Sequence, residues 1–168
     1  MPLSMYAISV PVYAHILTQL AATLDKAAAH CEAKKIEPKE LIGARLFPNM
    51  WSLAEQVRAV CNHATRGPAR IGGLPIPQFE GKDESFADLK ARIAWVLEFV
   101  NGLSPDQFAD AAERTVTFPS GGTEVSMTGE RYLLYFSMPN FYFHATAAYA
   151  ILRHNGVPLH KEDFMGSL

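Results

Sequence analysis

The chain has 168 residues, a formal net charge of −2 and 49% hydrophobic residues. A chain of this length fits one domain and buries about two thirds of its unfolded surface without disulfides or metals. We therefore expect a single domain over residues 1–168. A charge so close to neutral provides no basic surface for nucleic acid, which argues against a nucleic-acid partner.

Two features of the sequence concern the compartment. Cys31 and Cys61 form neither a Cys-x-x-Cys pair nor a disulfide framework, so they are typical of buried thiols in a reducing compartment. The first residues lack the basic stretch and the apolar core of a secretory signal. No apolar run reaches the about 18–20 residues that span a bilayer, so we expect a cytoplasmic protein without membrane contact.

The first long helix is predicted from Val10 to Lys35, with Pro11 in its first turn. Its apolar residues recur at spacings of three and four, which indicates one stripe for a bundle core. These residues are Tyr13, Leu17, Leu20, Leu24, Ala27 and Cys31. A short helix is then predicted to begin at Glu37 and to end near Pro48.

The second long helix is predicted from Asn49 to Thr65. Its apolar stripe consists of Leu53, Val57, Val60 and Ala64. Gln56 and His63 are seven residues apart and lie on an adjoining face. Prolines and glycines between residues 68 and 77 predict the clearest loop of the chain.

The third long helix is predicted to begin at Asp83–Ser85 and to stop at Asn101–Gly102. Acidic and hydroxyl side chains suit the start of a helix, and the glycine suits its end. A short turn is predicted at Ser104–Phe108. Alternation of apolar and polar residues then predicts a β-hairpin, made of Arg114–Phe118, the turn Pro119–Gly122 and Glu124–Met127.

The fourth long helix is predicted from Thr128 to Gly156 and is apolar on almost every side. Pro139 leaves two alternatives open within it: a continuous, bent helix with a freed Tyr135 carbonyl, or a separate turn before a helix that begins at the proline. Four long helices without strand–helix alternation predict an all-α fold. We expect an up-and-down four-helix bundle with a small β-hairpin before the last helix.

Polar residues on two of these helices predict a pocket in the bundle core. Asn140 and His144 are four residues apart, so both can address one point. His63 is the expected partner of His144, with Gln56 and Tyr135 also lining the pocket. Two imidazoles and two amides could hold a weak metal site or a closed hydrogen-bond network, because zinc takes three or four strong ligands. Both alternatives stay open, and no residue receives a catalytic role.

Aromatic residues encircle the last helix, and not all of them can face one core. They are Tyr132, Tyr135, Phe136, Phe141, Tyr142, Phe143 and Tyr149. A second copy of the chain is the simplest cover for the outer ones, so we expect a two-fold homodimer.

The last helix also carries a family resemblance. The pattern Asn140-x-x-x-His144, then Leu152-Arg153, then Gly156-Val-Pro158 resembles the C-terminal signature of the DinB/YfiT-like superfamily. More closely, the whole chain resembles a bacterial family of unknown function within that superfamily. The matching stretches are Leu3–Val12, Leu24–His30, Gln56–His63 and Pro139–His144.

The resemblance implies an up-and-down bundle, often dimeric, with a site in the bundle core. It also implies a divalent metal such as zinc or nickel held by three histidines, and transfer or isomerisation with low-molecular-weight thiols. His144 falls on the second histidine of the family motif, and Asn140 replaces the first. The histidine of the second helix corresponds to His63 or, alternatively, to the position of Gln56.

Two hypotheses about function follow. The first is a metal-assisted, thiol-dependent transferase with its site at Gln56, His63, Asn140 and His144. The second is a non-enzymatic bundle, structural or binding a small molecule, that has lost the metal site of the superfamily. The sequence leaves both open.

Overall fold

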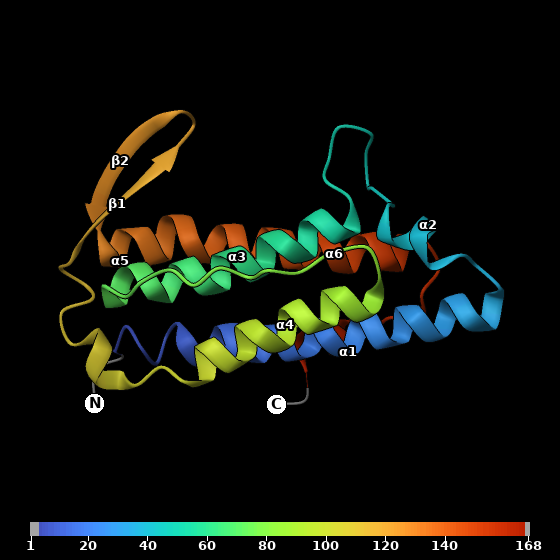
Figure 1. The fold of residues 1–168 in the computed structure, drawn as a ribbon, viewed down its shortest axis with the longest axis horizontal. Helices are drawn as coiled ribbons and strands as arrows, with labels where there is room; N and C mark the ends of the chain where they lie inside the picture. The colour runs from blue at the N-terminus through green and yellow to red at the C-terminus, as the bar shows by residue number, and fades with distance from the viewer. Residues whose placement is uncertain (1–3, 167–168) are drawn as a thin grey trace.

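The computed structural model describes residues 4–166 of the chain. They form a mostly helical fold with one two-stranded antiparallel sheet (Figure 1). This confirms the predicted combination of helices and a small hairpin. Between residues 4 and 166, no helix combines the length and the apolar character needed to cross a membrane.

Four long helices lie side by side along the long axis of the molecule (Figure 1). They are α1 (Val10–Lys34), α3 (Leu53–Gly72), α4 (Phe86–Asn101) and α6 (Met138–His154). Both α1 and α3 pack against α4 and against α6. The apolar stripes of all four helices meet in one core, whose fully buried members include Leu17, Leu53, Ile93 and Leu152. Because α3 and α6 are neighbours, polar side chains from these two helices can meet.

Shorter elements connect the long helices, namely α2 (Pro38–Ile42), η1 (Pro105–Phe108), α5 (Gly129–Tyr132) and α7 (Lys161–Met165). α2 ends well before the predicted end near Pro48, so residues 43–52 form a loop. α7 was not predicted, because the chain after Pro158 reads as a tail. It packs against α1, where the Lys26 ammonium lies 2.6 Å from the Asp163 carboxylate.

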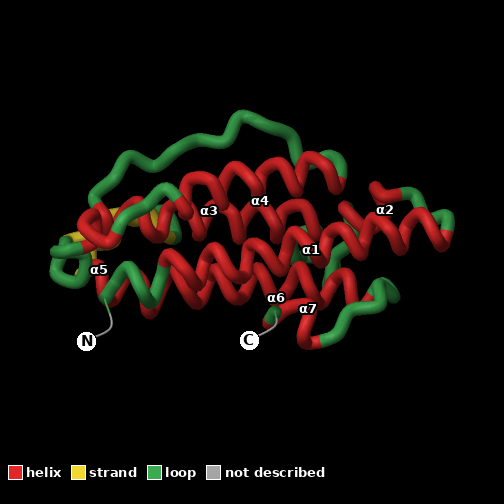
Figure 2. The backbone as a smooth tube through the Cα atoms, turned by 90° about the horizontal axis from the view of Figure 1, so that it is seen from below, coloured by secondary structure: helices red, strands yellow, loops and turns green. Residues whose placement is uncertain are grey.

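The connection between α3 and α4, residues 73–85, runs extended along the helices (Figure 2). It is anchored by Arg92 of α4, which is 7% exposed. Arg92 donates two hydrogen bonds of 2.7 and 2.9 Å to the carboxylate of Asp83. Its guanidinium also lies 4.4 Å from the ring centre of Phe79. This bidentate pair fixes the end of the connection.

The hairpin projects from one end of the molecule (Figure 1). β1 (Thr115–Ser120) pairs antiparallel with β2 (Thr123–Thr128). The turn at Gly121 and Gly122 has φ angles of 59° and 82°, which glycine adopts without strain. Phe118 of β1 is 2% exposed, so the hairpin is packed firmly onto the helices.

α3 begins at Leu53, not at the predicted Asn49. Ser52 and Glu55 form a capping box there. The Ser52 N–H donates to the Glu55 carboxylate at 2.7 Å, and the Glu55 N–H donates to the Ser52 hydroxyl at 3.4 Å. The sequence signal Ser-x-x-Glu therefore marks the start of this helix.

α3 also continues past the predicted end at Thr65, so the expectation that Pro68 lies in a loop was wrong. The surrounding residues Gly67, Pro68, Ala69 and Ile71 are all buried. Their packing outweighs the one backbone hydrogen bond that a proline removes. Gly73, with φ of 66°, then ends the helix. The extension places Arg66 and Arg70 on the same helix as His63.

The last long helix runs without a break from Gly129 to His154, but it contains one wider turn. This turn is η2 (Leu133–Ser137), a π-helical turn in which the Met138 N–H donates to the carbonyl of Leu133. It lies directly before Pro139, where the backbone N–H is missing. The continuous helix is thus the correct alternative, and the separate turn is wrong.

Ser137, the last residue of the π turn, lies in the core, where its hydroxyl is hydrogen-bonded to that of Tyr13 at 2.8 Å. Both residues are fully buried. Gly67 of α3 lies against this pair, and a Cβ there would lie 2.5 Å from each hydroxyl oxygen. The close approach of α3 to α1 and η2 therefore depends on a residue without a side chain.

Candidate functional site

The centre of the site is His144 on α6, which is 8% exposed. Its Nδ1 lies 2.7 Å from Oε1 of Gln56, a residue of α3 that is 1% exposed. The amide nitrogen of Gln56 donates to the backbone carbonyl of Trp51 at 3.3 Å. A carbonyl only accepts, so the amide oxygen faces His144 and the ring hydrogen lies on Nδ1. Nε2 of the neutral ring is consequently an acceptor.

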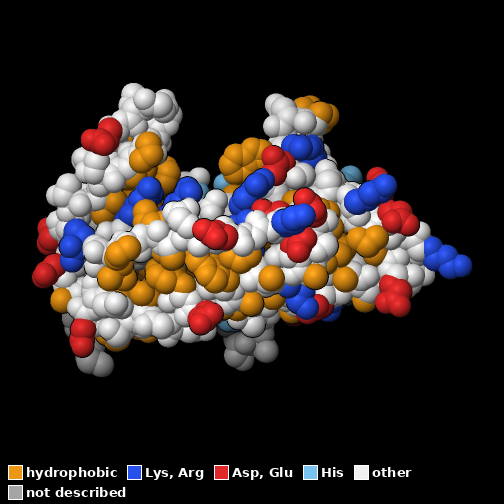
Figure 3. Space-filling view, in the orientation of Figure 1, with side chains coloured by type: hydrophobic (Ala, Val, Ile, Leu, Met, Phe, Trp, Pro, Cys, Tyr) orange, Lys and Arg blue, Asp and Glu red, His pale blue; other side chains and the backbone are white. Residues whose placement is uncertain are grey.

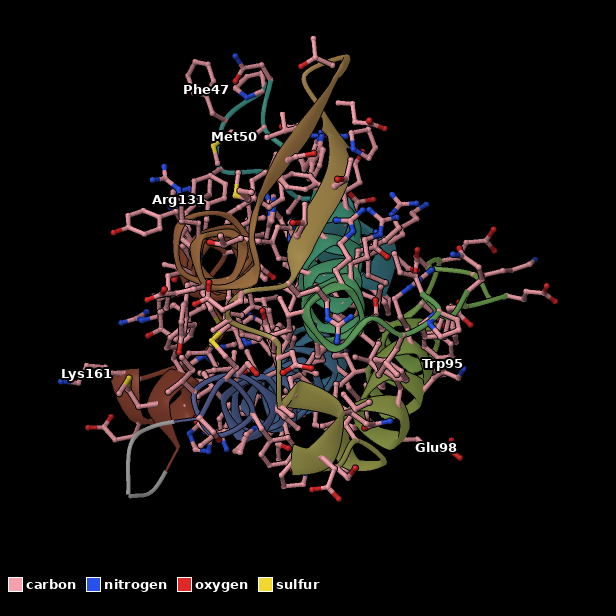
Figure 4. All side chains as sticks on the ribbon, turned by 90° about the vertical axis from the view of Figure 1, so that its left-hand side faces the viewer. Phe47, Met50, Trp95, Glu98, Arg131 and Lys161 are labelled. Carbon is pink, nitrogen blue, oxygen red and sulfur yellow. The ribbon has the colours of Figure 1, made fainter. Side chains whose placement is uncertain are left out.

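Two further rings stack with His144. The Trp51 ring centre lies 5.2 Å from it with an interplanar angle of 12°, and the His63 ring centre lies 5.7 Å from it at 18°. Trp51 comes from the loop of residues 43–52, whose Phe47 and Met50 extend beyond the helices (Figure 4). As the sequence predicts, the structure brings Gln56, His63 and His144 together.

Both imidazoles are neutral at pH 7. The pKa of His63 is lowered to about 4, mainly by burial and then by the nearby His144, Arg66 and Arg70. Burial also lowers the pKa of His144. Each ring therefore presents one unprotonated nitrogen.

A surface pocket of about 320 Å³ opens beside this cluster. Trp51 and His63 form part of its lining, together with other residues of α3, namely Glu55, Arg58, Ala59, Asn62 and Arg66. The face shown in Figure 3 carries two projections, the hairpin and the loop of residues 43–52, and Lys and Arg side chains lie between them.

Two predicted pocket residues, Asn140 and Tyr135, lie outside the cluster. The Asn140 amide nitrogen donates to the carbonyl of Phe136 on its own helix, at 2.7 Å. Tyr135 is 75% exposed, and its ring centre lies 5.5 Å from the guanidinium of Arg131. Neither residue is among those that line the pocket beside the cluster.

The sequence analysis missed Trp51 and the arginines of the pocket. A detectable signal existed for each. The capping box fixes the start of α3 directly after Trp51, and the pocket arginines Arg58 and Arg66 are eight residues, about two turns, apart. Because the helix was predicted to end at Thr65, Arg66 was not recognised as a residue of the same helix as Arg58.

The donor set does not fit the metal centre that the resemblance implies. Over residues 4–166, no three His, Cys, Asp or Glu side chains are grouped so that they could hold a metal ion. His63 and His144 supply two donors, whereas zinc takes at least three from protein. His15 of α1 lies elsewhere, with Nε2 2.5 Å from the carbonyl of Met165.

The lowered pKa of His63 predicts a pH dependence of stability. The unfolded ring binds a proton near pH 6.5 and the folded ring only near pH 4, so stability is lost as pH falls through this interval. We expect the free energy of unfolding to fall by about 1 kcal/mol from pH 7 to pH 5.5, measured by urea denaturation. His63→Gln should reduce this decrease to the share of His144, whose pKa is also lowered by burial, and the exposed His160→Gln should keep it in full. Equal pH dependence in wild type and His63→Gln would contradict the prediction.

The chain is similar to known proteins in both structure and sequence. A DinB family member protein from Shewanella denitrificans, known from a crystal structure, is 36% identical to this chain. The two align over 98% of this chain and 93% of the other, with a TM-score of 0.91. The chain is thus a DinB family protein. Residues 5–165 match the model of a domain of unknown function, DUF1993, and the chain belongs to that family. None of the curated proteins matches it.

Proposed function

We propose that this protein is an up-and-down four-helix bundle that binds a small molecule beside Trp51, His63 and His144 without a resident metal ion. The observation that carries this proposal is the bond between His144 Nδ1 and Gln56 Oε1. It orients His144 through a protein partner, and no third metal donor joins the two imidazoles among residues 4–166.

The protonation of the histidines supports binding over acid–base chemistry. A general base works best when its pKa lies near the working pH. The pKa of His63 is lowered to about 4, so its ring is a weak base at pH 7. A neutral ring beside an open pocket is well suited to hydrogen-bonding a ligand.

The transferase hypothesis has less support. A metal would act there as a Lewis acid that lowers the pKa of a bound thiol. The cluster beside the pocket provides two imidazoles, His63 and His144, and Asn140, which replaces a family histidine, is bonded to its own helix.

The outer face of η2 and α6 supports the predicted homodimer. Tyr135 and Phe143 are 75% and 57% exposed, and Tyr142 lines an apolar surface groove with Leu46 and Met50 of the projecting loop. The homodimer and the cytoplasmic location stay predictions.

Metal analysis tests the proposal. Protein purified without a histidine tag should contain zinc and nickel at well below one ion per chain. Dialysis against EDTA should leave the urea midpoint unchanged, because removal of a bound ion would lower it. One ion per chain in the wild type, lost in His144→Ala, would instead support the metal-assisted transferase.

A further inference from the structure

The pocket beside Trp51 is rich in arginine. Arg58 and Arg66 are two turns apart on α3 and both line it, with His63 between them in sequence. Arg70 follows one turn later, and its guanidinium donates to the Tyr132 hydroxyl at 2.9 Å. The arginines therefore lie on neighbouring turns along one side of α3. Figure 3 shows Lys and Arg side chains between the two projections of this face.

The positive charge of this pocket is poorly neutralised by the protein. Within residues 4–166, Arg66 has no carboxylate within 4.0 Å and no hydrogen-bond partner for its side chain. Arg58 lies 3.7 Å from Asp83, but Arg92 already binds that carboxylate with two hydrogen bonds.

Glu55 is the one carboxylate among the lining residues of the pocket. It accepts hydrogen bonds from the backbone and hydroxyl of Ser52, and it lies 3.1 Å from the guanidinium of Arg45. Ser52 and Arg45 therefore stabilise its charge, with a smaller effect from Arg58. Among the described residues Arg66 has no ion pair, and Arg58 shares Asp83 with Arg92.

Trp51 adds a flat apolar surface to this charge. Its ring lines the pocket, stacks with His144 and is nevertheless 51% exposed. The bond from Gln56 to the Trp51 carbonyl and the capping box at Ser52 fix the backbone on which the ring is carried. An exposed ring on a fixed backbone is a suitable surface for stacking a ligand ring.

We propose that this pocket binds an organic anion, with a carboxylate or phosphate between Arg58 and Arg66 and an aromatic ring against Trp51. The planar guanidinium fork pairs with both kinds of oxyanion, which is why the two arginines define the ligand class. The inference rests on the proposed small-molecule function and specifies its ligand.

Fluorescence titration tests this ligand class. The chain has two tryptophans, so Trp95→Phe leaves Trp51 as the reporter. Benzoate and phenyl phosphate should each change its emission saturably at concentrations up to about 10 mM, and benzylamine should not. Arg66→Gln should weaken the anions about tenfold, because it removes a charge-assisted contact. Arg153→Gln, which removes the same charge on exposed α6 surface, is the matched control and should bind as the parent does.

The probes separate the two proposals. If benzyl alcohol and benzylamine bind as well as the anions, and Arg66→Gln has no effect, the anionic ligand class is wrong and a small-molecule pocket stands. If benzoate, phenyl phosphate, benzyl alcohol and benzylamine all leave Trp51 emission unchanged, both proposals fall. A response to benzoate alone or to phenyl phosphate alone identifies which oxyanion the arginines select.

Discussion

Replacing Gly67 with alanine is expected to lower the free energy of unfolding by about 2 kcal/mol, the net of two opposing effects. The new Cβ would lie 2.5 Å from the hydroxyl oxygens of Tyr13 and Ser137. Both side chains are fully buried and bonded to each other, so relieving the overlap costs about 3 kcal/mol. Alanine in a helix interior regains about 1 kcal/mol over glycine. Urea denaturation measures the net change.

Gly102 offers a matched control at the end of α4. Its φ is −79°, and an added Cβ would lie 3.4 Å from the nearest atom, an ordinary contact. Gly102→Ala should therefore change stability by less than about 0.5 kcal/mol. If the two alanine variants are equally stable, Gly67 does not set the approach of α3 to η2.

Replacing His144 with alanine is expected to lower the free energy of unfolding by about 1–3 kcal/mol. The substitution leaves the Gln56 oxygen, in a residue that is 1% exposed, without its donor. It also removes the ring that stacks with Trp51 and His63. The emission of Trp51, measured in the Trp95→Phe background, should change at the same time.

Two variants separate the hydrogen bond from the ring. His144→Asn keeps an N–H in a position similar to that of Nδ1, so it should recover about 1 kcal/mol relative to alanine. His154→Ala removes an exposed histidine from the same helix and should change stability by less than about 0.5 kcal/mol. Unchanged stability in His144→Ala, together with the loss of a stoichiometric metal, would restore the metal-assisted hypothesis.

Much of the fold was predictable because its signals are local. The spacing of apolar residues gives the long helices, and the pair Gly121–Gly122 between alternating segments gives the hairpin. The signal for the start of α3 is also local, because Ser52 and Glu55 form a capping box, but the prediction began the helix at Asn49. The end of α3 has no such local signal. Pro68 is a strong signal against helix, and only packing around it overrides that signal.

The candidate site, too, was predictable only where a local pattern in the sequence indicates it. The seven-residue spacing of Gln56 and His63 placed both on one face of a helix, and His144 on the last helix was their expected partner. Asn140 and Tyr135 do not line the pocket beside this cluster: the Asn140 amide nitrogen is bonded to its own helix, and Tyr135 is 75% exposed. Trp51 was missed because the helix was predicted to begin at Asn49, whereas the capping box at Ser52 leaves Trp51 in the loop before it.

By itself, the sequence determined the helical class, the hairpin and the membership in a DinB-like family, because these follow from periodicity, turn chemistry and motif residues. The resemblance also implies that Asn140 stands where the superfamily motif has its first histidine. The tertiary structure decided what surrounds His144. The pairing of α3 with α6 supplies Gln56 and His63, and the loop of residues 43–52 supplies Trp51. Contacts between distant segments form only when the helices pack, so they leave no local pattern in the chain.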